Sequence, residues 1–169
     1  MKQYARPDSD IENPGVWTIA PLWEKMDEEP YSDADYIISP KSAIGKSFTI
    51  GLSNLIDPEV HTGHILRVRA QVSGVSGTIK FELLQGTTVI KDSGDIALPL
   101  AFQEYSFSLP EVEAATITDY TALRVRTTAV TTRKNKYQWL SWVRFECPLS
   151  GSPKRVFGKL YQFMTNLVP

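Results

Sequence analysis

The chain has 169 residues, of which 42% are hydrophobic and 22% charged, proportions that are typical of a globular domain and exclude a wholly disordered chain. Its 18 Lys and Arg residues nearly balance its 19 Asp and Glu residues, so no basic excess points to a nucleic-acid partner. No apolar run approaches the roughly 18 residues of a membrane span, and the first residues lack the apolar segment of a signal peptide. We therefore expect neither a nucleic-acid nor a membrane partner.

Residues 1–15 are polar and rich in turn residues, so they predict an N-terminal arm or an irregular lead-in. Six later segments alternate apolar and polar residues with a period of two, the pattern of half-buried strands. These segments are Phe48–Leu52, Leu66–Val72, Ile79–Leu83, Tyr105–Leu109, Leu123–Ala129 and Val143–Cys147. Because turns and no long helical pattern separate them, residues 16–148 predict an all-β, antiparallel sandwich, jelly-roll-like, with an immunoglobulin-like Greek key as the alternative.

Residues 149–169 do not fit the sandwich and predict a linker followed by a docking segment. A Ser-Gly-Ser-Pro break at 150–153 precedes apolar residues that recur with the spacing of one helix face. These residues are Val156, Phe157, Leu160, Tyr161, Met164 and Leu167. A helix this short is marginal alone in water, so we expect a short amphipathic helix or an extended arm that packs on a partner surface.

The residues that could carry chemistry are few. The only histidines, His61 and His64, lie in a segment that leads into a predicted strand, and no further ligand stands near them. The acidic pairs at 8/10, 27–29 and 33/35 could hold calcium or serve glycoside hydrolysis, but solvated turns are the commoner use of such residues. Cys147, the only cysteine, shares the buried strand parity and is expected to be unreactive. We predict no catalytic residue, no metal and no cofactor.

Two groups of residues are candidates for an interface. Trp142 has the strand parity opposite to Val143 and lies beside Arg144, and an outward Trp with Arg is typical of binding hot spots. Four arginines hold polar-face positions on two strands, where they would form one basic stripe if those strands were neighbours. They are Arg67, Arg69, Arg124 and Arg126.

The ordered sequence features carry a resemblance. They run from Arg6-Pro7-Asp8-Ser9-Asp10-Ile11 through residues 51–58 and 62–70 to Ile117-Thr118-Asp119-Tyr120. This order resembles a β-sandwich module of tailed-bacteriophage and prophage virion structural proteins. The resemblance implies a non-enzymatic capsid decoration (cement) protein, made in the host cytoplasm and placed in the virion. Its expected partners are the major capsid protein or other virion proteins and further copies of itself.

Two alternatives remain at this point. The chain could be a glycan-binding module of a phage tail tip or fibre, or a structural component of the neck or tail. The orientation of Trp17, Trp23 and Trp142 separates the first alternative from a structural role. A flat row of exposed rings favours sugar binding, and buried rings favour a structural part.

Overall fold

The computed structural model describes residues 1–74, 77–132 and 136–149. The predicted linker and docking arm from 150 onward lie outside the described residues. This holds for all six apolar residues of that segment, which are Val156, Phe157, Leu160, Tyr161, Met164 and Leu167. Their role therefore stays a prediction.

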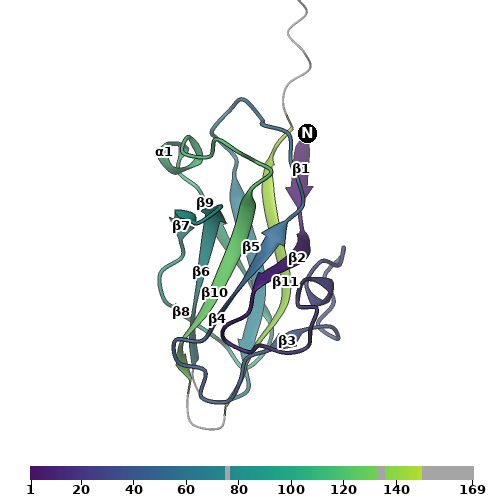
Figure 1. The fold of residues 1–169 in the computed structure, drawn as a ribbon, viewed down its shortest axis with the longest axis vertical. Coiled ribbons are helices and arrows are strands. Elements are labelled where there is room, and N and C mark those ends of the chain that lie inside the picture. Colours follow the sequence, from purple (N-terminus) through teal and green to yellow (C-terminus); the bar gives the residue numbers. More distant parts are fainter. Residues whose placement is uncertain (75–76, 133–135, 150–169) are drawn as a thin grey trace, which may run out of the picture.

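The described chain forms two antiparallel sheets packed face to face (Figure 1). The first, here called the β11 sheet, has the order β1 (Lys2–Ala5), β11 (Gln138–Pro148), β5 (Ile65–Val72) and β9 (Gln103–Ser108), with β3 (Ile37–Ile38) also paired to β11. The second, the β10 sheet, has the order β2 (Pro7–Glu12), β4 (Ser47–Leu52), β10 (Leu123–Thr132), β6 (Gly77–Gln85) and β7 (Thr88–Asp92), with β8 (Ile96–Ala97) also paired to β6. The helical segments η1 (Trp23–Lys25) and α1 (Glu111–Ala114) are short, and the described part holds no helix long and apolar enough to span a membrane.

The predicted all-β, jelly-roll-like antiparallel sandwich is confirmed. Each of the six alternating segments lies in a strand, and their inward residues fill the space between the sheets. Phe48, Phe81 and Phe145 are fully buried, as the period-two pattern requires. Phe107 is only partly buried and packs at the margin of the core. Cys147 is buried, and this burial raises the pKa of its thiol to about 11, which agrees with an unreactive side chain.

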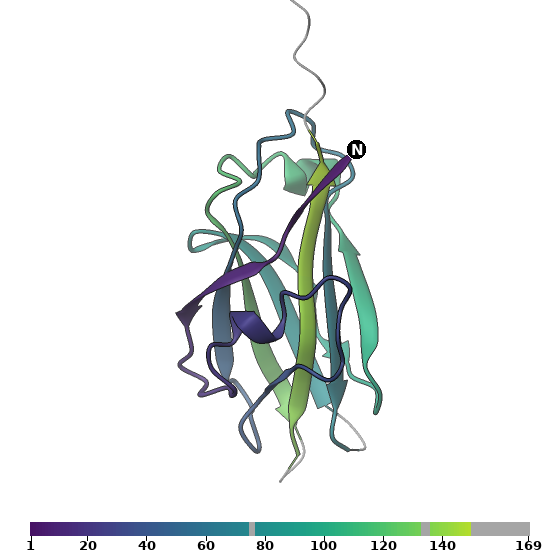
Figure 2. The ribbon, with the colours of Figure 1, turned by 90° about the vertical axis from the view of Figure 1, so that its right-hand side faces the viewer.

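The prediction of an arm or irregular lead-in for residues 1–15 is wrong. β1 pairs with β11 at the edge of one sheet, and β2 pairs with β4 at the edge of the other, so the chain crosses between the sheets at Arg6 (Figure 2). Edge strands need only one pairing partner, and here a single backbone ladder holds each of two segments with little apolar alternation. The sandwich therefore begins at Lys2 and not at residue 16.

His64 ends the loop that leads into β5, as expected, and the structure adds that it is buried there. Only 1% of the residue is exposed, its Nε2 lies 2.8 Å from the Tyr120 hydroxyl, and its ring contacts that of Phe145. His61 is exposed. The imidazole of His64 thus lies in the interior just before β5 begins, with the Tyr120 hydroxyl as its hydrogen-bond partner.

Replacing His64 with alanine is expected to lower the free energy of unfolding by about 1–3 kcal/mol, because it removes a packed ring and leaves the Tyr120 hydroxyl without its partner.

Burial lowers the pKa of His64, so at acid pH the unfolded chain binds a proton that the folded chain does not. Stability should therefore fall as the pH drops below about 6.5, and His64→Gln should lose this part of the pH dependence. Urea unfolding at several pH values measures the stability loss and its pH dependence, and His61→Ala is the control. If His61→Ala lowers the free energy of unfolding as much as His64→Ala, the buried role of His64 is wrong.

Candidate functional site

The outer face of the β11 sheet brings four of the predicted interface residues together. The register of β11 against β5 pairs Trp142 with Arg69 and Arg144 with Arg67. Their strand neighbours Val68 and Val143 belong to the core, so these four side chains leave the sheet on the outer side. The predicted interface on this pair of strands is therefore one continuous surface.

The stripe of four arginines, which required their two strands to be neighbours, does not form. Arg67 and Arg69 lie on β5, whereas Arg124 and Arg126 lie on β10 in the other sheet. Since outer faces of the two layers point in opposite directions, the two arginine pairs are separated by the whole sandwich. Arg126 is held by Glu82, with Nε donating to Oε2 at 2.6 Å.

A series of aromatic rings and guanidinium groups covers the outer side of β11. The Arg144 guanidinium carbon lies 4.7 Å from the ring centroids of both Tyr4 and Trp142. Tyr31 meets Trp142 edge-on at 5.8 Å, and the Arg69 guanidinium carbon lies 4.3 Å from the Tyr31 centroid. We call Tyr4, Tyr31, Arg69, Trp142 and Arg144 the aromatic–arginine face.

The exposed rings of this face are tyrosines and not tryptophans. Trp142 points to the predicted side of the sheet but is only 2% exposed, because Tyr31 packs on it and the Glu28 carbonyl accepts its Nε1–H at 2.8 Å. Trp17 is buried in the core and Trp23 on η1 is only partly exposed, so the three tryptophans form no flat exposed row. The two buried tryptophans, Trp17 and Trp142, thus favour a structural part over a tryptophan sugar platform. Tyr4 and Tyr31 are 45% and 43% exposed and are the rings a partner can reach.

Carboxylates compensate every cation around this face. Asp33 accepts two hydrogen bonds from Arg69, both at 2.6 Å, and the pKa of Asp33 is lowered mainly by these bonds. Arg144 donates to Glu29 at 2.8 Å and to Glu146 at 2.7 Å. The ion pairs join the cations Lys2, Arg67, Arg69 and Arg144 to the carboxylates Glu29, Asp33, Glu104 and Glu146. The face is therefore dense in charge but neutral.

A second group of rings lies farther along the same strand. Trp139 stacks on Tyr36 with centroids 5.4 Å apart and an interplanar angle of 21°, and Phe102 lies 6.4 Å from Trp139. The register of β11 shifts between Leu140 and Trp142, so Trp139 is not a core residue although Leu140 beside it is. This bulge puts both tryptophans of β11 on its outer side.

Three residues of the acidic pairs considered from the sequence, Asp10, Asp33 and Asp35, have structural partners. Asp10 accepts the backbone N–H groups of Leu22 and Trp23 at 2.8 and 3.0 Å and thereby fixes the start of η1, which lies against β2. Asp35 is paired with Lys25 at 3.3 Å. Within the described ranges, no group of three or more His, Cys, Asp or Glu side chains is arranged to hold a metal ion.

Sequence reasoning missed Tyr4 and Tyr31. Tyr4 lies in the segment expected to be an arm, and Tyr31 lies between the strands, where no periodic pattern assigns a side chain to a face. The only available signal was composition, because tyrosine beside arginine and acidic residues is common at binding surfaces.

No model of a protein family matches the chain, and no curated protein has a similar sequence. Among solved structures, the chain is similar to the C-terminal family 6 carbohydrate-binding module of LamC, a marine laminarinase from Zobellia galactanivorans (11% identity, 86% of this chain and 98% of that chain, TM-score 0.49). It is also similar to a family 35 carbohydrate-binding module from an environmental isolate (13% identity, 89% of this chain and 99% of that chain, TM-score 0.47). A further similar structure is a family 29 module, CBM29_1, from Piromyces equi (16% identity, 91% of this chain and 94% of that chain, TM-score 0.43). At these identities and TM-scores the likenesses assign no function to the chain.

Proposed function

We propose that this chain is a non-catalytic glycan-binding module and that the aromatic–arginine face contacts the glycan. The observation that carries the proposal is the pair of half-exposed tyrosine rings, Tyr4 and Tyr31, each held against an arginine on one neutral face. Sugar rings present apolar C–H faces to aromatic rings, and their hydroxyls exchange hydrogen bonds with charged groups. This face offers both kinds of contact side by side.

The contacts of the face also reduce the entropic cost of binding. Arg144 is fixed between two rings and two carboxylates, and Arg69 is fixed by a bidentate pair with Asp33. Tyr4 and Tyr31 are thereby held in place before a ligand arrives, and pre-ordered groups lose less freedom on binding. Since the charges cancel, the field of the face favours neither cationic nor anionic ligands, which supports a neutral glycan.

Replacing Tyr31 or Tyr4 with alanine is expected to weaken binding of a neutral polysaccharide by about tenfold or more, because each change removes one reachable ring. Affinity electrophoresis against β-glucan, xylan and mannan, followed by calorimetry with the best ligand, measures the effect. Val112→Ala is the control, because this exposed residue lies on α1 and outside the face.

Thermal unfolding of the three variants separates lost binding from lost folding. The proposal fails if the wild-type chain binds none of these glycans, or if the Tyr31 and Tyr4 variants bind as tightly as Val112→Ala.

The capsid-decoration role remains a prediction from the sequence resemblance. The same face would suit it, since tyrosine, tryptophan and arginine also dominate protein–protein hot spots. A chain that binds no glycan but whose association with virion proteins or with its own copies depends on Tyr31 would favour this role.

A further inference from the structure

A small pocket lies on the outer face of the β10 sheet, on the opposite side of the sandwich from the aromatic–arginine face. Its volume is about 170 Å³. That is several times the roughly 30 Å³ that one water molecule occupies in the liquid and less than the roughly 300 Å³ at which sites for drug-sized ligands begin. The space therefore suits one small ring and not a chain.

One residue that lines the pocket is a glycine at an outward position of β4. Ile50 and Leu52 are core residues, so Gly51 between them faces outward, opposite Ser9 of β2 and Arg124 of β10. A Cβ atom on Gly51 would collide with the Ser9 Oγ and lie 3.1 Å from an oxygen of the Asp8 carboxylate. The φ angle of Gly51 lies outside the left-handed region, so the close approach of Ser9, and not the backbone conformation, requires glycine here.

Two bulges in β2 turn further side chains toward the same space. The pairing of β2 with β4 skips Asp8, between Pro7 and Ser9, and skips Ile11, between Asp10 and Glu12. Both skipped residues line the pocket, Asp8 with a carboxylate and Ile11 with a 42% exposed apolar side chain. Bulges often re-aim side chains at binding sites, and this strand has two within six residues.

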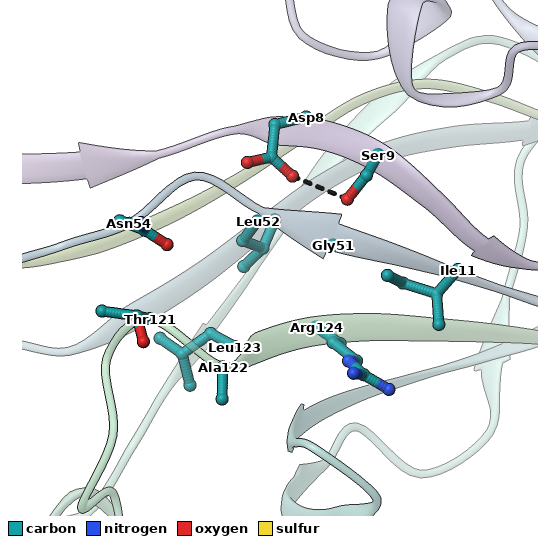
Figure 3. A pocket seen from close by; sticks show the side chains of 10 residues that line it. All are labelled: Asp8, Ser9, Ile11, Gly51, Leu52, Asn54, Thr121, Ala122, Leu123 and Arg124. Carbon is teal, nitrogen blue, oxygen red and sulfur yellow. Dashed lines mark hydrogen bonds between the residues drawn. The ribbon is translucent and has the colours of Figure 1, made fainter.

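The polar groups that surround the pocket carry hydrogen-bonding capacity that the fold does not use (Figure 3). Among the described residues, neither the Arg124 guanidinium nor the Asn54 amide has a partner. The other arginines of the described strands are all ion-paired; they are Arg67, Arg69, Arg126 and Arg144. Arg124 differs from them in flanking the open space over Gly51.

The groups on the two sides of the pocket have complementary hydrogen-bonding roles. Arg124 and Asn54 can donate, whereas the Asp8 carboxylate accepts and already takes one bond from Ser9 at 2.8 Å. Thr121 donates its hydroxyl hydrogen to Asp119 at 2.7 Å, so its oxygen can accept. An anion would be repelled by Asp8, and a cation by Arg124. A vicinal diol satisfies both, because each hydroxyl donates and accepts.

We infer that the pocket over Gly51 binds a single neutral sugar ring, with its hydroxyls between Asp8 and Arg124 and its apolar edge against Ile11. This would be a second sugar site, separate from the aromatic–arginine face, and the module would then hold two glycans on opposite sides. Because the two sites share no residue, an experiment can disprove glycan binding at one of them without affecting the evidence for the other.

Chemical-shift mapping of the ¹⁵N-labelled full chain tests the inference with D-glucose, D-galactose, D-mannose and D-xylose as probes. At least one sugar is expected to shift the amide signals of Gly51, Asn54 and Arg124. Arg124→Ala should weaken this binding about tenfold or more, since hydrogen bonds to a charged group contribute that much. Arg6→Ala is the matched control, because it removes an equal charge outside the pocket.

Two further comparisons make the result decisive. Gly51→Ala should abolish the shifts while all charges stay, because its methyl group displaces the Ser9 and Asp8 side chains that line the pocket. If this variant does not fold, Arg124→Ala and Asn54→Ala carry the test. Tyr31→Ala should leave the pocket signals unchanged even where polysaccharide binding is lost. The inference is overturned if no sugar moves these signals, if acetate or inorganic phosphate moves them and the sugars do not, or if Arg6→Ala weakens binding as much as Arg124→Ala.

Discussion

Replacing Phe81 with alanine is expected to lower the free energy of unfolding by about 3–5 kcal/mol, one of the largest effects of any single substitution in this chain. Phe81 on β6 is fully buried, and its ring lies 6.1 Å from that of Phe107 on β9, so the pair joins the two sheets. The substitution removes a ring from the space between the sheets and leaves a cavity that rigid strands fill poorly. Urea unfolding of the wild-type and variant chains measures the loss.

Phe107→Ala is the matched comparison, because it removes the other ring of the same contact. From the strand pattern alone we would expect Phe107→Ala to lower the free energy of unfolding as much as Phe81→Ala. The structure leaves Phe107 partly exposed, so part of its surface stays in water in both states, and we expect a loss of about 1–3 kcal/mol. Equal losses at the two positions would mean that Phe107 is as buried as Phe81.

The sandwich was predictable because its central strands bury one face. A strand such as β5, with Leu66 and Val68 inward and Arg67 and Arg69 outward, repeats with a period that only a half-buried strand satisfies. β1 and β2 were not predictable, since each is an edge strand held by backbone pairing with one neighbour and needs little alternation. His64 was missed for a related reason, because a single buried polar residue outside a strand has no period to reveal it.

For the candidate face, the sequence predicts which side of the sheet a side chain takes but not which residues come together there. The side of the sheet taken by Trp142 and Arg144 follows from residues two apart on β11. Which strands lie side by side depends on sheet topology, and so the pairing of Arg67 with Arg144, and not with Arg124, could not be read from the chain. The covering of Trp142 by Tyr31 depends on the path of a segment without regular structure.

Glu146 is a buried carboxylate that holds Arg144 of the aromatic–arginine face. Its side chain is 2% exposed and accepts hydrogen bonds from Lys2 at 2.8 Å and from Arg67 and Arg144 at 2.7 Å each. Replacing Glu146 with glutamine removes the charge that holds three cations while keeping the shape of the side chain. We expect the free energy of unfolding to fall by about 2–4 kcal/mol. This is below the largest losses for broken buried ion pairs, because the cations are partly exposed and water screens them.

The same substitution should remove part of the acid sensitivity of the fold. Burial alone would raise the pKa of Glu146, but the hydrogen bonds and charges of Lys2, Arg67 and Arg144 outweigh burial and lower it. A carboxylate with a lowered folded pKa adds stability above its unfolded pKa of about 4.5, and this stability is lost as the pH falls below that value. When the pH is lowered from about 6 to roughly 3, the free energy of unfolding should therefore fall less in Glu146→Gln than in the wild-type chain.

Glycan binding should fall together with stability in this variant. Without Glu146, Arg144 keeps only Glu29 as its ionic partner, so Arg144 and the Tyr4 ring beside it are held less firmly. Glu104→Gln is the control, since Glu104 is 33% exposed and contacts only Arg67 among these cations. Urea unfolding across pH and calorimetry with the best-bound polysaccharide measure the two effects. If Glu146→Gln and Glu104→Gln behave alike in both measurements, Glu146 does not organise this face.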